Sequence, residues 1–251
     1  MNFGTSGLAA LGFLALSALP GVAQDAGWDF EAAGYLWLPE SRSGVSTPWG
    51  EANTVLSASD ALDALDFGAM MVLNARKGDW ALVGDLFYLD LTLDSAMPLG
   101  ILYSDAETRV RLSALSGYGL YTLHQSDRYQ IEAGAGLRLM ASDIDLRLRG
   151  AAAADHRSSI SDTWVDPVLA LRATAQLNAN MAGVLWLDAG GFDIGASSDR
   201  TWQVSAMVNW QIDEKWTLGA GYRTLFVDRE SDGVPYHMRM SGPVLGVSVR
   251  F

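Results

Sequence analysis

The sequence predicts an all-β fold: an antiparallel up-and-down transmembrane β-barrel of about ten strands with one short loop helix. Three observations predict it. The N-terminal apolar segment is too short to cross a bilayer, an apolar–polar alternation continues along almost the whole chain, and short polar turns alternate with longer connections. The pattern allows eight to twelve strands.

Composition excludes several functional classes. The chain has 251 residues, of which 49% are hydrophobic, and its 17 basic and 29 acidic side chains give a net charge of −12. No basic run supplies the positive surface that nucleic acid requires, so a nucleic-acid partner is not expected. The absence of cysteine excludes disulfides and thiolate-bound metals. The sequence indicates neither a cofactor nor a metal site.

The first 23 residues contain no charged side chain and include an apolar run from Leu8 to Leu19. A membrane-spanning helix needs about 20 apolar residues, so this run is too short. Small residues at Gly21 and Ala23 form the pattern that a signal peptidase recognises. We therefore expect a signal peptide at 1–23 and a single outer-membrane barrel domain at 24–251.

After residue 23 no apolar run is long enough for a transmembrane helix. A bilayer can then be crossed only by a closed β-barrel. In 202–210 the apolar residues occupy every second position and polar residues mostly fill the positions between them. Alternation of this kind recurs in ten predicted strands: 27–38, 66–77, 79–94, 103–123, 129–148, 164–177, 181–193, 200–211, 215–230 and 236–251.

The connections differ systematically in length. Short polar turns are predicted at 77–79, 124–128, 178–180 and 213–215. Longer links are predicted at 39–65, 95–102 and 149–163, and shorter ones near 194–199 and 231–235. In outer-membrane barrels the short turns face the periplasm. The β-like stretch 53–57 is assigned to the first long link, because an eleventh span would make the strand number odd.

A soluble β-sandwich or a lipocalin-like barrel would show the same alternation with its apolar residues inside. Glycines and opposed charges on one face, aromatic residues near the strand ends on the other, and an aromatic C-terminus favour a barrel in the cell outer membrane of a Gram-negative bacterium. The predicted aromatic girdle consists of Trp202, Trp210, Trp216 and Tyr222.

Strand parity predicts a network of charges in the lumen. Its members are Asp85, Glu107, Arg109, Arg111, Glu132, Arg138, Asp166, Arg172, Asp188 and Arg223. Equal numbers of acids and arginines can neutralise one another through bidentate hydrogen bonds. One interpretation is a salt-bridged filling of the barrel, and the other is a selective polar conduit. A barrel of eight to ten strands has little space for anything but side chains, which favours the filled lumen.

A short helix is predicted after Ser59, with Leu62 and Leu65 on one face. Two interpretations stay open, a plug or lid for the barrel and an ordinary piece of the first long link.

Candidate catalytic groups are few. His156 with Ser158 is similar to the His-x-Ser spacing of a lipid A deacylase strand, but it falls in a predicted polar loop. His237 and Ser241 are too far apart along a strand for a hydrogen bond, and His124 falls in a short turn. No two histidines have metal-site spacing. The sequence therefore favours a non-enzymatic protein.

The final segment 240–251 is similar to the C-terminal signature of outer-membrane barrels, which implies that Phe251 is read by the barrel-assembly machinery. Other segments resemble a widespread group of uncharacterised proteobacterial outer-membrane β-barrel proteins: Trp28-Asp29-Phe30, Tyr35-Leu36-Trp37, 59–68, 75–80, 164–167, 188–192 and 221–223. This resemblance implies the fold and the location, with no reaction or ligand attached.

The sequence thus predicts a structural or surface role for a barrel with a polar, largely salt-bridged lumen. The alternatives are a narrow, porin-like passive pore for small solutes and a lipid-modifying enzyme. Outer-membrane lipid, lipopolysaccharide and the assembly machinery are the expected partners. The sequence does not specify an oligomeric state.

Overall fold

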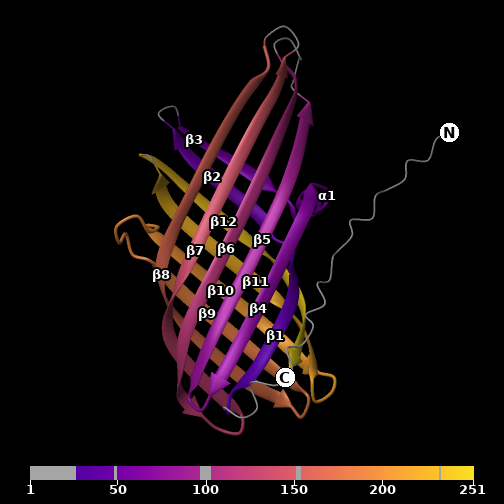
Figure 1. The fold of residues 1–251 in the computed structure, drawn as a ribbon, viewed down its shortest axis with the longest axis vertical. Coiled ribbons are helices and arrows are strands. Elements are labelled where there is room, and N and C mark those ends of the chain that lie inside the picture. Colours follow the sequence, from indigo (N-terminus) through magenta and orange to yellow (C-terminus); the bar gives the residue numbers. More distant parts are fainter. Residues whose placement is uncertain (1–26, 48–49, 97–102, 151–153, 232) are drawn as a thin grey trace, which may run out of the picture.

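A computed structural model describes residues 27–47, 50–96, 103–150, 154–231 and 233–251. The predicted signal peptide at 1–23 lies outside these residues. In the described part of the chain, ten strands form a closed antiparallel barrel (Figure 1). They are β1 (Asp29–Trp37), β4 (Leu65–Lys77), β5 (Trp80–Ala96), β6 (Tyr103–Gln125), β7 (Tyr129–Gly150), β8 (His156–Asn178), β9 (Met181–Gly191), β10 (Arg200–Gln211), β11 (Trp216–Ser231) and β12 (Val234–Arg250).

Each barrel strand pairs with the next along the chain, and β1 pairs with β12 to close the sheet. This up-and-down order and the number ten confirm the predicted fold. The predicted ends of most strands agree with the structure to within about three residues. The long link predicted at 149–163 is wrong, because β7 continues to Gly150 and β8 already begins at His156. Continued pairing of these two strands beyond the barrel satisfies their backbone hydrogen bonds.

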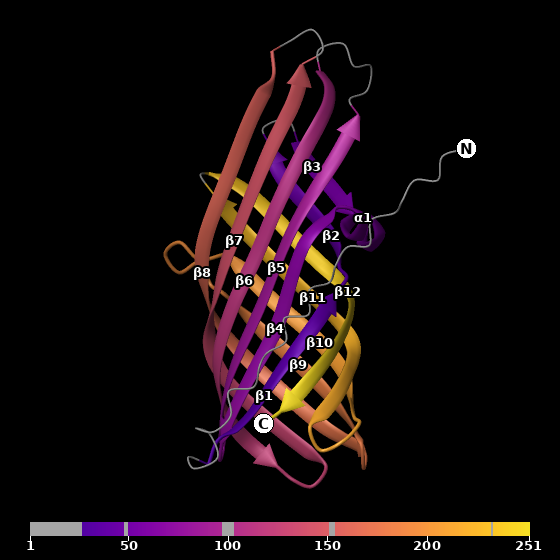
Figure 2. The ribbon, with the colours of Figure 1, turned by 45° about the vertical axis from the view of Figure 1, so that its right-hand side comes forward.

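The first long connection contains a hairpin, β2 (Glu40–Thr47) and β3 (Gly50–Leu56). β1 pairs with β12 only as far as Trp37, and β2 then takes over the same edge of β12 from Glu40 onward. β3 is hydrogen-bonded to β2 at the end of the sheet order (Figure 2). The assignment of 53–57 to a link is therefore confirmed, since β3 is not one of the ten barrel strands.

The short helix α1 spans Ala58–Asp63 and begins two residues earlier than predicted. Ser57, and not Ser59, is its N-cap, because the Ser57 side chain accepts a hydrogen bond from the backbone amide of Asp60. The helix has no buried residue and lies at the side of the barrel in both ribbon views. It does not plug the lumen. No helix of the described residues is long and apolar enough to span a membrane.

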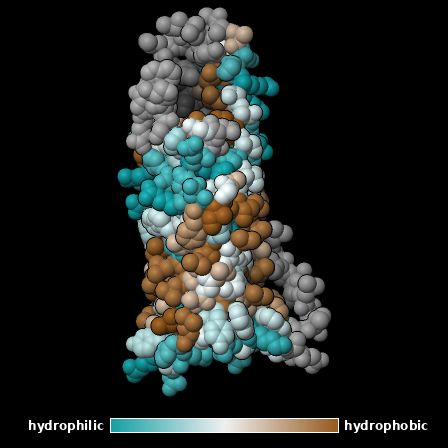
Figure 3. All heavy atoms as spheres, turned by 90° about the vertical axis from the view of Figure 1, so that its left-hand side faces the viewer, coloured by the Kyte–Doolittle hydropathy of each residue, from teal (hydrophilic) through white to brown (hydrophobic). Residues whose placement is uncertain are grey.

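The outer surface of the barrel carries an apolar band. Figure 3 shows hydrophobic side chains gathered in the lower half of the molecule, with hydrophilic side chains below and above them. Exposed outward side chains include Leu82, Leu137, Leu169, Leu218 and Leu245. Water would not stabilise so large an apolar surface, whereas the hydrocarbon of a bilayer does. The band therefore marks the height at which the barrel crosses the membrane.

The alternation reverses along the longest strands. In the lower part of β6, Leu115 and Tyr121 face outward and Tyr118 is buried in the lumen. Farther up the same strand, the outward positions are charged and the inward position Leu112 is apolar and buried. The reason is the surrounding medium, which is lipid around the lower half and water around the upper half.

The C-terminus completes the seam of the barrel. The Phe251 amide donates to the Phe30 carbonyl at 3.0 Å, and the Phe30 amide donates to the Phe251 carbonyl at 3.3 Å. The two rings are stacked with their centroids 6.2 Å apart. The last residue thus extends the β1–β12 pairing by one position at the end that carries the short turns.

We expect deletion of Phe251 to lower the yield of folded barrel, because it removes both seam hydrogen bonds and the outward aromatic ring. The measurement is the amount of heat-modifiable protein in outer-membrane fractions. Phe251→Ala keeps the backbone and tests the ring alone. Arg250→Ala is the matched control and should be nearly neutral, since its side chain is 61% exposed. Equal yields for the wild type and the deletion would contradict the prediction.

Candidate functional site

Seven of the ten predicted lumen charges do face the lumen: Asp85, Glu132, Arg138, Asp166, Arg172, Asp188 and Arg223. Six of them form three ion-paired clusters, and Asp166 contacts the link between β9 and β10. Arg138–Asp188, Arg223–Asp85 and Arg76–Glu132 join strands that are not neighbours in the sheet, whereas Arg172 and Glu132 are direct partners on the adjacent strands β7 and β8.

The first cluster is centred on Arg138 of β7, which is 1% exposed. Its Nη2 lies 2.8 Å from Asp188 of β9, and the same guanidinium donates to the hydroxyls of Tyr118, Ser116 and Thr201. Asp188 also accepts a hydrogen bond from the indole of Trp186. Burial of a charge is tolerated when it is paired and hydrogen-bonded, and each of the three guanidinium nitrogens of Arg138 has a partner.

The second cluster is centred on Arg223 of β11. Its Nη2 lies 2.7 Å from Asp85, and its other nitrogens donate to Gln203 and to the Tyr35 hydroxyl. The guanidinium also lies 4.9 Å from the ring centroid of Trp37, which adds a cation–π contact. The arginine therefore links β11 to strands on the opposite wall of the barrel.

The third cluster lies nearer the short turns and joins Glu132 of β7 to two arginines. Arg172 Nε is 2.5 Å from Glu132, and Arg76 is a second partner of the same carboxylate. Glu132 is 1% exposed. Arg76 is not among the lumen charges that the sequence predicts. Its even position on β4, shared with lumen-facing Met70 and Val72, was the signal that could have found it.

An apolar layer fills the lumen beyond the Arg223 cluster. Trp37, Phe87, Met140, Trp164 and Leu225 are each at most 3% exposed and belong to one contiguous core. Trp37 and Phe87 meet edge to face at 5.8 Å. Water-accessible space is therefore absent around these side chains.

Asp166 has a role that parity alone did not predict. It has no ion pair among the described residues, and its carboxylate accepts hydrogen bonds from the backbone amide and hydroxyl of Ser198 and from the Trp164 indole. Arg229 fixes the same β9–β10 link through the carbonyl of Ala196 and pairs with Asp162. These contacts fold the link 192–199 against the mouth of the barrel.

The lumen assignment of Glu107, Arg109 and Arg111 is wrong. Even-numbered residues of β6 face the lumen, so these three odd-numbered residues project from the outer face of its upper half. The error has a physical cause: the polar face of a strand is its lumen face only where the outside is lipid. Above the apolar band the polar face turns outward to water.

These outward charges form ion pairs across neighbouring strands. Arg109 binds Asp90 with Nη2–Oδ2 2.6 Å, Arg111 binds Asp145 at 3.0 Å, and Glu107 binds Arg147 at 3.1 Å. The hydrogen bonds from Arg109 lower the pKa of Asp90, because they stabilise the charged form of the carboxylate. The upper parts of β5, β6, β7 and β8 form a wall that rises above the rest of the barrel (Figures 1 and 2). The outward ion pairs join β5, β6 and β7 on the outer face of this wall.

The inner face of this wall is apolar. Leu91, Val110, Ile144 and Ile160 are successive cross-strand partners and form one row. Leu91 is buried near the core, whereas Ile160 is 67% exposed at the far side of the wall. The wall therefore presents one charged face and one apolar face.

The four predicted girdle residues all face outward, but only the three tryptophans lie at the ends of the apolar band. Trp210 and Trp216 lie near the short turns, and Trp202 lies toward the upper edge, where it stacks on Phe226 at 5.6 Å. Tyr222 is the cross-strand partner of Ala206 and lies about halfway between the two levels, so its assignment to a girdle is wrong. The tryptophans take the positions that aromatic side chains adopt at the two membrane interfaces.

The histidines are dispersed. His156 and Ser158 lie in β8 rather than in a loop, both exposed, and neither side chain has a hydrogen-bond partner among the described residues. His237 lies on the outer face opposite Asp228, and His124 lies at the end of β6 and not in the turn. No group of three or more metal-ligating side chains occurs in the part of the chain that the structure describes.

Solved structures with a similar fold are bacterial outer-membrane proteins. The outer membrane protease OmpT of Escherichia coli matches with a TM-score of 0.62 and 8% identity, over 91% of this chain and 98% of that chain. Neisserial surface protein A gives 0.38 and 15%, over 90% and 98% of the two chains. The attachment invasion locus protein Ail of Yersinia pestis gives 0.40 and 10%, over 90% and 99%. No family model matches the chain, and no curated protein is similar to it in sequence.

At 8% identity the likeness to OmpT concerns the fold alone. The closed barrel, its apolar band and this fold agree with one another. The chain is a multi-pass β-barrel of the bacterial outer membrane.

We expect Asp188→Ala to destabilise the barrel by about 3–5 kcal/mol, because it leaves Arg138 as a buried charge without its carboxylate. Urea unfolding of the barrel in lipid vesicles, followed by tryptophan fluorescence, measures the change. Asp228→Ala is the matched control. It removes a carboxylate from an outward pair with Arg200, whose side chain is 70% exposed, and should change stability by about 0–1 kcal/mol. Equal losses in the two variants would contradict a special role for the lumen pair.

Proposed function

We propose that this protein is a non-conducting, non-enzymatic outer-membrane barrel whose role is structural or at the cell surface. The observation that carries the proposal is the burial of ion pairs across the lumen: Arg138, Glu132 and Asp188 are each at most 5% exposed. An aqueous conduit would leave such groups hydrated. Here their partners are other protein side chains, which fill the lumen between the strands.

The apolar layer supports the same conclusion. A solute that passes the Arg138 and Arg223 clusters would also have to displace Trp37, Phe87 and Met140, which have at most 1% of their surface exposed. These side chains pack at the density of a protein interior, so their displacement is costly. The narrow-pore alternative therefore requires a rearrangement of the core.

A surface role is supported by the wall of β5 to β8. This wall extends the barrel well beyond the apolar band and offers side chains of two kinds to the exterior. Pairing of β6 with β7 continues to Gly150, with a register shift between Tyr103 and Asp105, so the wall is hydrogen-bonded sheet to the last described residues of β7. Ordered surfaces of this kind bind partners without a large loss of conformational entropy.

A lipid-modifying enzyme is the competing proposal. It requires a nucleophile and a base within hydrogen-bond reach, and His156 and Ser158 have no such bond to any described residue. If the enzyme proposal holds, expression of the protein changes the mass of lipid A, and His156→Ala abolishes that change.

We expect planar bilayers that contain the purified, heat-modifiable barrel to show little or no steady current, because the lumen clusters exclude water. A general porin reconstituted in parallel verifies that insertion and recording work. Arg138→Gly and Arg223→Gly, combined, should raise the conductance by removing both central side chains. A large, steady current through the wild-type barrel would refute the proposal.

A further inference from the structure

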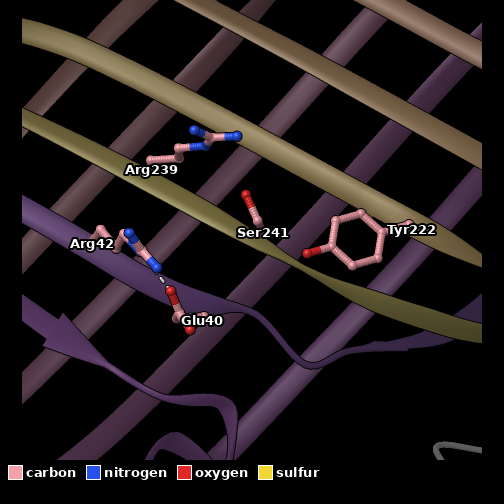
Figure 4. A pocket seen from close by; sticks show the side chains of 5 residues that line it. All are labelled: Glu40, Arg42, Tyr222, Arg239 and Ser241. Carbon is pink, nitrogen blue, oxygen red and sulfur yellow. Dashed lines mark hydrogen bonds and ion pairs between the residues drawn. The ribbon is translucent and has the colours of Figure 1, made fainter.

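A hollow of about 400 Å³ lies on the outer face of the barrel, away from the lumen. It is lined by Glu40 and Arg42 of β2, Tyr222 of β11, and Arg239 and Ser241 of β12 (Figure 4). None of these residues takes part in the lumen clusters.

Two arginines on neighbouring strands line this hollow. Arg42 and Arg239 are cross-strand partners in the β2–β12 pairing, and both are exposed. Like charges in directly opposite positions destabilise a sheet. Glu40 compensates Arg42 with Nε–Oε1 2.6 Å, but no described carboxylate lies within ion-pair distance of Arg239. The hollow therefore has one positive charge in excess and attracts an anion.

Two hydroxyl groups line the same hollow. The Ser241 oxygen is buried and has no hydrogen-bond partner among the described residues. Figure 4 shows it between Arg239 and the ring of Tyr222. A tetrahedral oxyanion can accept bidentate hydrogen bonds from guanidinium groups and single bonds from hydroxyls. A phosphate is therefore the anion that fits this donor set.

The height of the hollow identifies the source of the phosphate. Arg239 is the cross-strand partner of Phe226, which stacks on Trp202 at the upper edge of the apolar band. Below Arg239 on the same outer face lie Pro243 and the exposed Leu245. The hollow thus lies at the interface between hydrocarbon and water, where lipid phosphates are found.

We propose that Arg42 and Arg239 bind a phosphate group of an outer-leaflet lipid, the phosphorylated sugar of lipid A. The overall charge of −12 repels such lipids, so attachment depends on a local cationic site. Arg239 supplies the uncompensated charge, Arg42 the second guanidinium, and the Tyr222 and Ser241 hydroxyls the remaining donors. The site does not depend on whether the lumen conducts.

The test is native mass spectrometry of the full, detergent-solubilised barrel with bis-phosphorylated lipid A as the probe. We expect Arg42→Gln with Arg239→Gln to weaken binding about tenfold or more, which corresponds to about 1.4 kcal/mol. Arg128→Gln with Lys215→Gln is the matched control, because it removes the same charge from the short turns at the opposite end. Heat modifiability verifies that each variant is folded.

Three comparisons decide whether the bound phosphate belongs to lipid A and whether it binds in this hollow. Undiminished lipid A binding by the double arginine variant, or equal loss in the control, would overturn the proposal. Equal binding of lipid A without phosphate would also overturn it. If inorganic phosphate competes as strongly as lipid A on a molar basis, the hollow is a free-phosphate site and the lipid assignment fails. Ser241→Ala should give a smaller loss than the double variant.

Discussion

Closure of the sheet is the constraint on which the rest of this structure depends. Inside a bilayer no water pairs with backbone groups, so a sheet can cross only if its first and last strands are hydrogen-bonded. Here β12 meets that requirement with two partners in succession, β1 below and β2 above. The hairpin of β2 and β3 thereby protects the part of β12 that β1 is too short to reach.

Once the sheet is closed, its interior must be filled, and this chain fills it with charge. Each buried arginine spans from its own strand to a carboxylate on a distant one, as Arg223 does with Asp85. Such pairs contribute little net stability compared with apolar packing, but removal of one partner is costly. They therefore favour one arrangement of the strands over shifted alternatives, in which the donors and acceptors would no longer meet.

Much of the architecture could be predicted from the sequence, because the medium imposes a two-residue period on every strand. That period gave the ten spans and the inward position of Arg138. It failed on β6, where Arg109 and Arg111 are polar because they face water, not because they face the lumen. The pairing of Arg76 with Glu132 and of Arg109 with Asp90 could not be assigned either, since parity gives the face of a residue and the partner is set by three-dimensional pairing. The hollow at Arg239 depends on the β2–β12 pairing, which no local pattern reveals.

The reversal of polarity along β6 also fixes the depth at which the barrel is immersed. A displacement of two residues toward the periplasm would carry Arg111 into the edge of the hydrocarbon, and a further displacement would carry Arg109 after it. The cost of each charge rises with depth, to about 2–4 kcal/mol at the midplane. A displacement the other way would expose Leu115 and Leu137 to water. The barrel is thus held at one vertical position, and tilting is resisted most on the side where the charged wall begins.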